Sequence, residues 1–376
     1  MDFNVLLALM VEKKASDLFI TAERTPTLKV DGSLIPATGM PLTADQALVM
    51  VLSVMDQRQR DEFEKTKECQ FAINVHDLGR FRVSAFTQRN CAGMVLRRIE
   101  SNIPDADDLN LPPILKALIM EKRGLIIFVG GTGTGKSTSL AALIKHRNQN
   151  SSGHIITIED PIEFLHPHLG CIVTQREVGI DTESYEIALK NTLRQAPDVI
   201  LIGEIRTRET MQNAITFAET GHLCLSTLHA NNADQALDRI LHFFPDAMHD
   251  QVLLDLSLNL KGIVAQQLIR RNDGLGRYPA IEILINTPLI KDYIRKGEIH
   301  KLKEVMKNSQ EQSMQTFDQA LYDLYVAGKI SYEDALNSAD SKNEVRLMIK
   351  LGSAKSSLLE NNAMRLMATG DENNDF

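Results

Sequence analysis

The feature that most constrains this chain is the glycine-rich segment Gly130-Gly-Thr-Gly-Thr-Gly-Lys-Ser137. It follows the apolar run 125–129 and precedes a helical pattern, which is the context that a phosphate-binding loop requires. Glycines let successive backbone N–H groups turn toward a phosphate, and the start of the helix adds its positive dipole end. We therefore predict a nucleotide site formed by Gly130, Gly131, Thr132, Gly133, Thr134, Gly135, Lys136, Ser137 and Thr138.

Within this site, Lys136 is expected to reach the β- and γ-phosphates, and the hydroxyl of Ser137 to bind Mg²⁺. No [NT]KxD segment of the kind that reads a guanine base occurs in the chain, which disfavours a GTPase. The predicted cofactors are thus ATP and Mg²⁺.

The pattern of apolar residues predicts an α/β protein with two domains of different kinds. Short alternating runs before residue 100 indicate a small α/β domain built on an antiparallel sheet. After residue 113, continuous apolar runs separated by helical stretches are typical of a parallel sheet that is buried on both faces. The predicted organisation is a domain at 1–100, a linker at 101–113, an ATPase domain with a C-terminal helical part at 114–350, and a polar, mobile tail at 351–376.

Acidic residues end two of the predicted buried strands. The run 198–206 ends near Glu204, and the run 154–163 ends in Glu159, Asp160 and Glu163. Carboxylates at the carboxyl edge of such a sheet face the ligand, where hydrolysis needs a group that holds the metal and a group that positions water. For each acid, a solvated strand end remains the alternative interpretation.

Two histidines, His222 and His229, flank a third predicted buried strand. A histidine at a strand end is often a structural hydrogen-bonding group, and that interpretation stays open for His222. His229 is the better functional candidate, because beside a terminal phosphate it could sense hydrolysis or pair with a carboxylate.

Charge and composition exclude several classes of function. The chain has 41 Lys+Arg against 49 Asp+Glu, a net charge of −8, no Trp and 5% aromatic residues, which argues against direct binding of nucleic acid. No apolar run is long enough to span a bilayer, so no transmembrane segment is expected. The four cysteines are widely spaced and form no CxxC pair, which fits a reduced cytoplasm.

Four motifs stand in one order along the chain: GGTGTGKS, ITIEDPIEF, DVILIGEIR and TGHLCLSTLHANNA. Their combination resembles the type II/type IV secretion ATPase superfamily over about residues 1 to 350. The later segments DRILHFFP, VAQQLIRR and MQTFDQALYDLYVAGKISYEDAL narrow the resemblance to the retraction ATPases of type IV pili. Within that PilT-like branch, the chain is most similar to the accessory, PilU-like group.

The resemblance implies a PAS-like N-terminal domain, a RecA-like ATPase domain and a homohexameric ring that hydrolyses ATP to retract pili. It further implies a location at the cytoplasmic face of the inner membrane, a PilT-type retraction ATPase as partner, and a PilC-like platform protein as a second partner. By the resemblance, Glu204 matches the Walker B glutamate and a ligand of Mg²⁺, and Glu163 matches the glutamate that polarises water. Arg194, Arg206, Arg239 and Arg82 occupy arginine positions of the family, for each of which a structural salt bridge is an equal alternative.

Two departures from the principal motor favour the accessory assignment. The chain reads Gly-Glu-Ile-Arg-Thr207 where the principal motor has GEMRD, and PLIKDYIRKG where it has AIRNLIREGK. The second departure lies in the helical segment 288–307, in which Leu289, Ile290, Ile294, Leu302, Val305 and Met306 are expected to face the core. Its lysines and arginines would then form either a solvated face or a surface that docks a partner.

Two other functions remain open from the sequence. One is a RecA-like nucleic-acid translocase, which would show ATP hydrolysis stimulated by DNA. The other is a regulatory subunit that binds nucleotide with little turnover, and a turnover assay would decide it.

Overall fold

The computed structural model describes residues 3–30, 32–37, 39–99 and 102–352. The chain divides into two compact units: the first comprises residues up to 103 and residues 154–197, and the second comprises residues 104–153 and those from 198 onward. The domain bounds predicted above stay a prediction. The tail predicted at 351–376 lies, from residue 353 on, outside the described residues.

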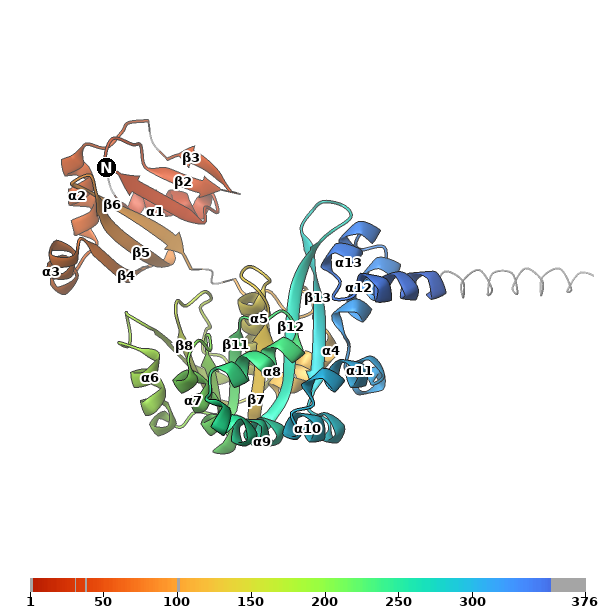
Figure 1. Ribbon diagram of the computed structural model, residues 1–376. Helices are drawn as coiled ribbons and strands as arrows, with labels where there is room; N and C mark the ends of the chain where they lie inside the picture. Colours follow the sequence, from red (N-terminus) through yellow and green to blue (C-terminus); the bar gives the residue numbers. More distant parts are fainter. Residues whose placement is uncertain (1–2, 31, 38, 100–101, 353–376) are drawn as a thin grey trace, which may run out of the picture. The chain divides into compact units, whose positions relative to one another are not determined.

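The first unit contains a six-stranded sheet with the strand order β3-β2-β1-β6-β5-β4 (Figure 1). Each of its pairings is antiparallel, which confirms the antiparallel sheet predicted from the alternating runs. Its strands are β1 (Asp17–Thr21), β2 (Thr27–Val30), β3 (Ser33–Pro36), β4 (Glu68–Val75), β5 (Gly79–Gln88) and β6 (Cys91–Arg98).

Three helices accompany this sheet: α1 (Phe3–Glu12), α2 (Ala44–Ser53) and α3 (Gln57–Thr66). The first turns of α2 and α3 are fixed by reciprocal hydrogen bonds of Thr43 with Gln46 and of Asp56 with Gln59. On β5, buried residues such as Phe81 alternate with residues that are only half-buried. One face of the strand therefore packs on the core, and the other face points away from it. This alternation places the side chains of Arg80 and Arg82 together on the face away from the core.

Residues 154–197 contribute further elements to the first unit. These are β8 (Gly153–Glu159), the neighbouring strand β9 (Cys171–Glu177), α6 (Tyr185–Thr192) and the 3₁₀ turn η1 (Leu193–Gln195). Strand β8 ends at Glu159, so Glu163 follows it by four residues in irregular backbone.

The second unit is built on five strands in the order β13-β12-β7-β11-β10. Strands β10, β11, β7 and β12 run parallel to one another, and β13 pairs antiparallel with β12. The residues of β7, β10 and β11 are buried, which confirms the parallel core predicted from the apolar runs. The bounds are β7 (Gly124–Val129), β10 (Val199–Ile202), β11 (Leu223–Leu228), β12 (Leu260–Arg270) and β13 (Arg277–Ile285).

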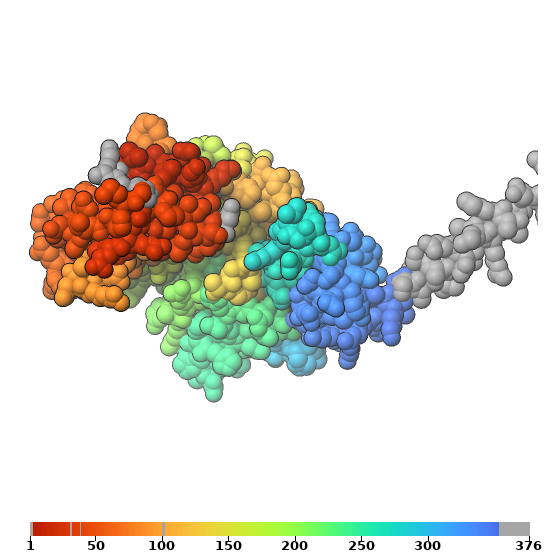
Figure 2. Space-filling view, turned by 90° about the horizontal axis from the view of Figure 1, so that it is seen from above, coloured from red at the N-terminus to blue at the C-terminus, as the bar shows by residue number. Residues whose placement is uncertain are grey.

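Helices connect these strands and continue to the end of the described chain. The tip of the β12–β13 hairpin lies beside the C-terminal helices, where the Asn272 N–H donates to the carbonyl of Lys329 at 3.1 Å (Figure 2). The helical elements are α4 (Pro113–Ile119), α5 (Lys136–Asn150), α7 (Arg208–Glu219), α8 (Ala233–His242), η2 (Asp246–Met248), α9 (His249–Asn259), α10 (Pro288–Arg295), η3 (Ile299–Lys301), α11 (Leu302–Lys307), η4 (Gln310–Gln312), α12 (Phe317–Val326) and α13 (Tyr332–Ser338).

The segment 288–307 is helical, as predicted, but one of its residues was assigned to the wrong face. Leu289 is 49% exposed, whereas Ile290 and Ile294 are fully buried. Leu289 is the second residue of α10, one position before Ile290, and the periodicity of a short helix does not decide which of two adjacent apolar residues is covered. Among the described residues, none of the helices has both the length and the apolarity needed to cross a membrane.

Candidate functional site

The glycine-rich loop joins the buried strand β7 to the start of α5. Gly130 and Gly135 have φ of 153° and 87°, conformations that L side chains rarely adopt. A Cβ at Gly130 would lie 2.6 Å from the backbone carbonyl oxygen of Gln266. A Cβ at Gly135 would lie 2.8 Å from the side-chain amide nitrogen of Gln266. These positions therefore require glycine, because both the backbone conformation and the close approach of β12 exclude a side chain.

Lys136 folds back over the loop that it follows. Its Nζ donates hydrogen bonds to the carbonyl oxygens of Gly130 and Gly131, at 2.7 and 2.8 Å, and the side chain is 9% exposed. Ser137 and Thr138 are half-buried in the first turn of α5. The ammonium and the Ser137 hydroxyl thus lie at the N-terminus of α5, where a phosphate would meet the helix dipole.

Gln266 is a support of this loop that the sequence analysis missed. Its side chain is 2% exposed on β12. The amide nitrogen donates to the carbonyl of Thr134 at 3.0 Å, while the amide oxygen accepts from the hydroxyl of Ser139 at 2.8 Å. The available signal was a pair of glutamines inside the apolar run GIVAQQLI, since a polar residue inside a buried strand needs a partner.

Glu204 lies at the centre of an ion-pair cluster at the carboxyl edge of the same sheet. Its Oε1 is 3.0 Å from Nε2 of His229, and its Oε2 is 2.7 Å from a terminal nitrogen of Arg206. Glu204 follows β10 by two residues and His229 follows β11 directly. Because these strands are adjacent and parallel, the two residues that the sequence singled out meet at one edge.

Two hydroxyl groups hold the backbone that carries Glu204. Ser226 donates to the carbonyl of Ile202 at 2.8 Å, and Thr227 donates to the carbonyl of Gly203 at 2.7 Å. The backbone N–H of Ile205 also donates to the carbonyl of Thr227 at 2.9 Å. These bonds fix the turn after β10 to β11, and so they set where the carboxylate of Glu204 stands.

Cavities surround the loop on both sides. The histidine-side cavity, of about 480 Å³, is lined by Gly131, His229, Ala230, Asn231, Gln235, Asp238, Arg239 and His242. A second cavity of about 350 Å³ shares Gly131 and Asn231 with it. The tyrosine-side cavity, of about 330 Å³, lies beside the start of α5 and is lined by residues that include Thr138, Leu268 and Tyr278.

The arginines expected from the sequence are placed differently from one another. Arg206 pairs with Glu204, and Arg239 on α8 is an exposed residue that lines the histidine-side cavity. Arg194 is exposed in η1 of the first unit. Arg239 therefore shares a cavity with Gly131 of the loop, whereas Arg206 belongs to the cluster at Glu204.

In the first unit, Arg82 pairs with a buried carboxylate. Its Nε lies 4.0 Å from Oε1 of Glu177, and Arg80 approaches the other oxygen of the same carboxylate at 4.0 Å. Glu177 is 2% exposed, and burial raises its pKa, an effect that the two arginines oppose. Arg82 thus makes a structural ion pair within the chain, whatever other role it has.

The acidic segment after β8 also belongs to the first unit. Glu163 is exposed, whereas Glu159 is half-buried and accepts a hydrogen bond from the hydroxyl of Thr157 at 2.6 Å. Burial raises the pKa of Glu159 to about 7, and the hydrogen bonds from Thr157 and Gln175 oppose that rise. Both carboxylates remain candidates for a group that handles a proton or a water molecule.

Two further features do not contribute to the nucleotide site. His222 precedes β11, at the end opposite His229, and lies within hydrogen-bond distance of the Thr220 hydroxyl at 3.1 Å, which supports the structural interpretation.

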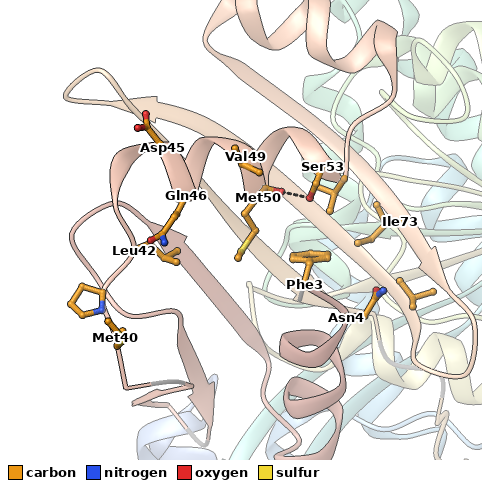
Figure 3. Close-up of a pocket in the computed structure, with 13 residues that line it drawn as sticks. Phe3, Asn4, Met40, Leu42, Asp45, Gln46, Val49, Met50, Ser53 and Ile73 are labelled. Atoms are coloured by element: carbon orange, nitrogen blue, oxygen red, sulfur yellow. Dashed lines mark hydrogen bonds between the residues drawn. The ribbon is translucent and has the colours of Figure 1, made fainter. Parts of the chain in front are cut away.

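An apolar cavity of about 900 Å³ lies between α1, α2 and β4, with Phe3, Val49 and Ile73 on its walls (Figure 3). None of the predicted site residues lines it.

Comparison with known proteins places the chain in a family. Residues 2–327 match the family described as type II/IV secretion system protein. The chain is 66% identical over 353 residues to the type IV pilus ATPase PilU of Pseudomonas aeruginosa, covering 94% of this chain and 92% of that protein. It is 39% identical over 339 residues to the type IV pilus retraction ATPase PilT of the same organism, covering 90% and 98%.

A solved structure agrees with these sequence matches. The crystal structure of the pilus retraction motor PilT with bound ADP superposes with a TM-score of 0.86 at 38% identity, covering 92% of this chain and 99% of that one.

Proposed function

Because the chain belongs to the type II/IV secretion system protein family, we propose that it is an ATPase that powers the retraction of type IV pili. The observation that carries this proposal is the meeting of Glu204, His229 and Arg206 at the sheet edge that also presents the glycine-rich loop. The high identity to PilU and the structural match to an ADP-bound retraction motor support the same activity.

The loop is suited to bind the phosphates of ATP. Gly130 and Gly135 hold the backbone in conformations that other residues rarely adopt, and Lys136 lies with its Nζ on the loop carbonyls. On binding, the ammonium exchanges these carbonyls for phosphate oxygens. The hydroxyl of Ser137 and the carboxylate of Glu204 are hard oxygen donors of the kind that Mg²⁺ prefers, and the bound ion neutralises charge on the phosphates.

The tyrosine-side cavity is the proposed site of the base and ribose. It adjoins Thr138 at the start of α5, and its walls include the apolar side chain of Leu268 and the ring of Tyr278. The guanidinium of Arg271 lies 4.7 Å from the centre of that ring, so the ring and its cation form one face of the cavity.

The remaining polar residues receive roles in the chemical step. Glu204 would help to hold Mg²⁺ and so orient the phosphate, and His229, which pairs with Glu204, would respond to the loss of the γ-phosphate. Glu163, with the half-buried Glu159 as the alternative, polarises the attacking water. Arg239, Arg206 and Arg194 are proposed to stabilise the charge of the transition state, and Arg82 to contact nucleotide.

A homohexameric ring is part of the proposal, because arginines at exposed positions could then complete a neighbour's site. We expect the specific ATPase activity to fall as the protein is diluted below the concentration at which the ring forms. The measurement is ATP turnover across a dilution series, with the oligomeric state followed by sedimentation velocity. Full activity in a monomeric fraction would contradict a site shared between subunits.

The accessory assignment rests on the two departures from the principal motor. At the first, Thr207 caps α7, with its hydroxyl accepting from the N–H of Thr210 at 3.3 Å, so a helix cap stands where the principal motor has an acid. We propose that the protein works beside a PilT-type motor and a PilC-like platform protein, at the cytoplasmic face of the inner membrane.

The basic side chains of α10 are proposed to dock one of these partners. Reversing Lys291, Arg295 and Lys296 to glutamate is expected to leave ATP turnover within about twofold and to abolish partner binding and retraction. Lys296 already pairs with Asp292 at 2.6 Å, so Lys291 and Arg295 should carry most of the effect. The measurement pairs the ATPase rate of the purified variant with pilus-dependent motility in cells.

A matched control separates docking from net charge. Reversing the exposed residues Arg58, Lys65 and Lys67 on and after α3 changes the charge equally at another surface. This control should keep both ATP turnover and pilus-dependent motility. If the α10 variant also keeps both, its basic face is only solvated, and if it loses both, α10 supports the ATPase site.

Retraction in living cells tests the proposed function as a whole. Deletion of the gene, with and without deletion of a PilT-type partner, is expected to weaken retraction, and the intact gene should restore it. Normal retraction without the gene would contradict the proposal, and ATP turnover stimulated by DNA would point to a nucleic-acid translocase instead.

A further inference from the structure

A buried glutamate of the second unit, Glu282, joins the N-termini of two helices. It lies in β13 opposite Ala265 of β12, and it is 2% exposed. One carboxylate oxygen accepts from the N–H of Ala233, the first residue of α8, at 2.8 Å. The other accepts from the N–H of Phe317, the first residue of α12, at 3.4 Å. Each bond satisfies a backbone donor that has no partner inside its helix.

The first of these helices, α8, begins directly after the loop of residues 229–232, which we call the histidine loop. Only residues 229–232 separate the last residue of β11 from the first residue of α8. One end of this loop is fixed by the pairing of β11 in the sheet, and the other by the bond from Ala233 to Glu282. His229, which touches Glu204, therefore stands on a short span whose far end is set by Glu282.

A second contact ties the same loop to the C-terminal helices. The side-chain amide of Asn232 donates to the carboxylate of Asp340 at 3.3 Å, and Lys303 pairs with that same oxygen at 2.7 Å. Asp318, which is buried in α12, accepts from the N–H of Asp340 at 2.9 Å. The loop is thus joined to α11 and α12 through Asp340, a connection separate from the one through Glu282.

Stability does not explain the charge of Glu282. Burial raises its pKa to about 7, with Asp340 and Asp234 adding to the rise and Lys303 and the bond from Ala233 opposing it. A carboxyl whose pKa is raised on folding favours the folded state most below its unfolded pKa, and this contribution is lost as the pH rises toward 7. Ionisation of Glu282 therefore costs stability near neutral pH, although both of its carboxyl oxygens accept from backbone N–H groups.

We propose that Glu282 is a positioning residue of the ATPase site, which holds the histidine loop in place by fastening the start of α8 to β13 and α12. The inference rests on the proposed function, since it acts through His229 and its contact with Glu204. It also gives the C-terminal helices a direct mechanical connection to the nucleotide site.

The test compares Glu282→Gln, His229→Ala and the double variant in the full chain. Glutamine keeps one acceptor oxygen and turns an NH₂ group toward the second N–H, so one helix start must shift. We expect kcat to fall about tenfold, with KM for ATP within about twofold and an unchanged or higher melting temperature. The double variant should lose no more than His229→Ala alone, because both act through one residue.

One control variant and one second variant of the same loop keep the result decisive. Asp17→Asn, at a 3% exposed carboxylate that pairs with Arg97 in the first unit, should leave kcat unchanged. Asp340→Ala cuts the second connection of the loop at a less buried position and should lower kcat in the same direction, which guards against a folding defect of Glu282→Gln.

The inference is overturned if Glu282→Gln lowers only the melting temperature and leaves kcat unchanged, or if the losses of the two single variants multiply in the double variant. A His229→Ala variant with normal kcat would overturn it as well. That last outcome can be told apart from the first two. It would show that His229 has no part in the proposed catalytic site, whereas the first two concern Glu282 alone.

Discussion

Replacing Lys136 with alanine is expected to abolish ATP hydrolysis, with a loss of at least about 100-fold in kcat. The ammonium is the cation at the mouth of the glycine-rich loop, and it bonds there to the carbonyls of Gly130 and Gly131. Without it, the charge that develops on the phosphates is not stabilised, and the affinity for ATP also falls. The measurement is steady-state phosphate release by the purified variant, with circular dichroism to verify the fold.

The same helix offers a matched control. Lys145 lies nine residues further along α5 and pairs with Asp105 at 2.7 Å, away from the loop. Lys145→Ala removes a lysine of the same helix and should retain the ATPase rate. If a folded Lys136→Ala variant turned over ATP at the normal rate, the site would be assigned to the wrong loop.

Glu204→Gln is expected to separate binding from hydrolysis. The amide keeps the shape of the side chain but loses the charge that holds His229 at 3.0 Å and Arg206 at 2.7 Å. We expect ATP to bind with an affinity near that of the wild type and to persist, while hydrolysis slows by about 100-fold or more. A rapid-quench measurement of bound ATP and ADP in a single turnover reports both quantities.

The control for this variant is Glu209→Gln, an exposed acid in the first turn of α7. It lies five residues from Glu204 and should leave the single-turnover rate unchanged. Rapid phosphate release by Glu204→Gln would move the catalytic role to the acidic segment after β8, where Glu163 and Glu159 are the candidates.

Local patterns were sufficient to predict the centre of the candidate site. A strand, a glycine-rich turn and a helix are contiguous in sequence, so the loop around Lys136 could be recognised from spacing alone. Glu204 and His229 could be placed at one edge because each ends a run of buried residues, and parallel strands end at the same side. In the structure the two side chains lie 3.0 Å apart, whereas their roles stay a prediction.

The supports of the site could not be predicted in the same way. Gln266 holds Thr134 across 132 positions of sequence, and Glu282 holds Ala233 across 49. The first contact depends on the parallel pairing of β12 with β7, and the second depends on β13, which pairs antiparallel with β12; no local pattern identified either pairing beforehand. A polar residue in a buried strand indicates that a partner exists, but it does not say which one.

The most direct test of the account is the force of pilus retraction in cells whose own copy of the gene carries Glu204→Gln. Force is measured by optical trapping of a bead bound to the pilus, with the Glu209→Gln strain as control and the amount of protein checked in both. Pili are expected to extend still in the Glu204→Gln strain, while the retraction force falls well below that of the control. Full retraction force in that strain would contradict the claim that ATP hydrolysis at this site powers the pull.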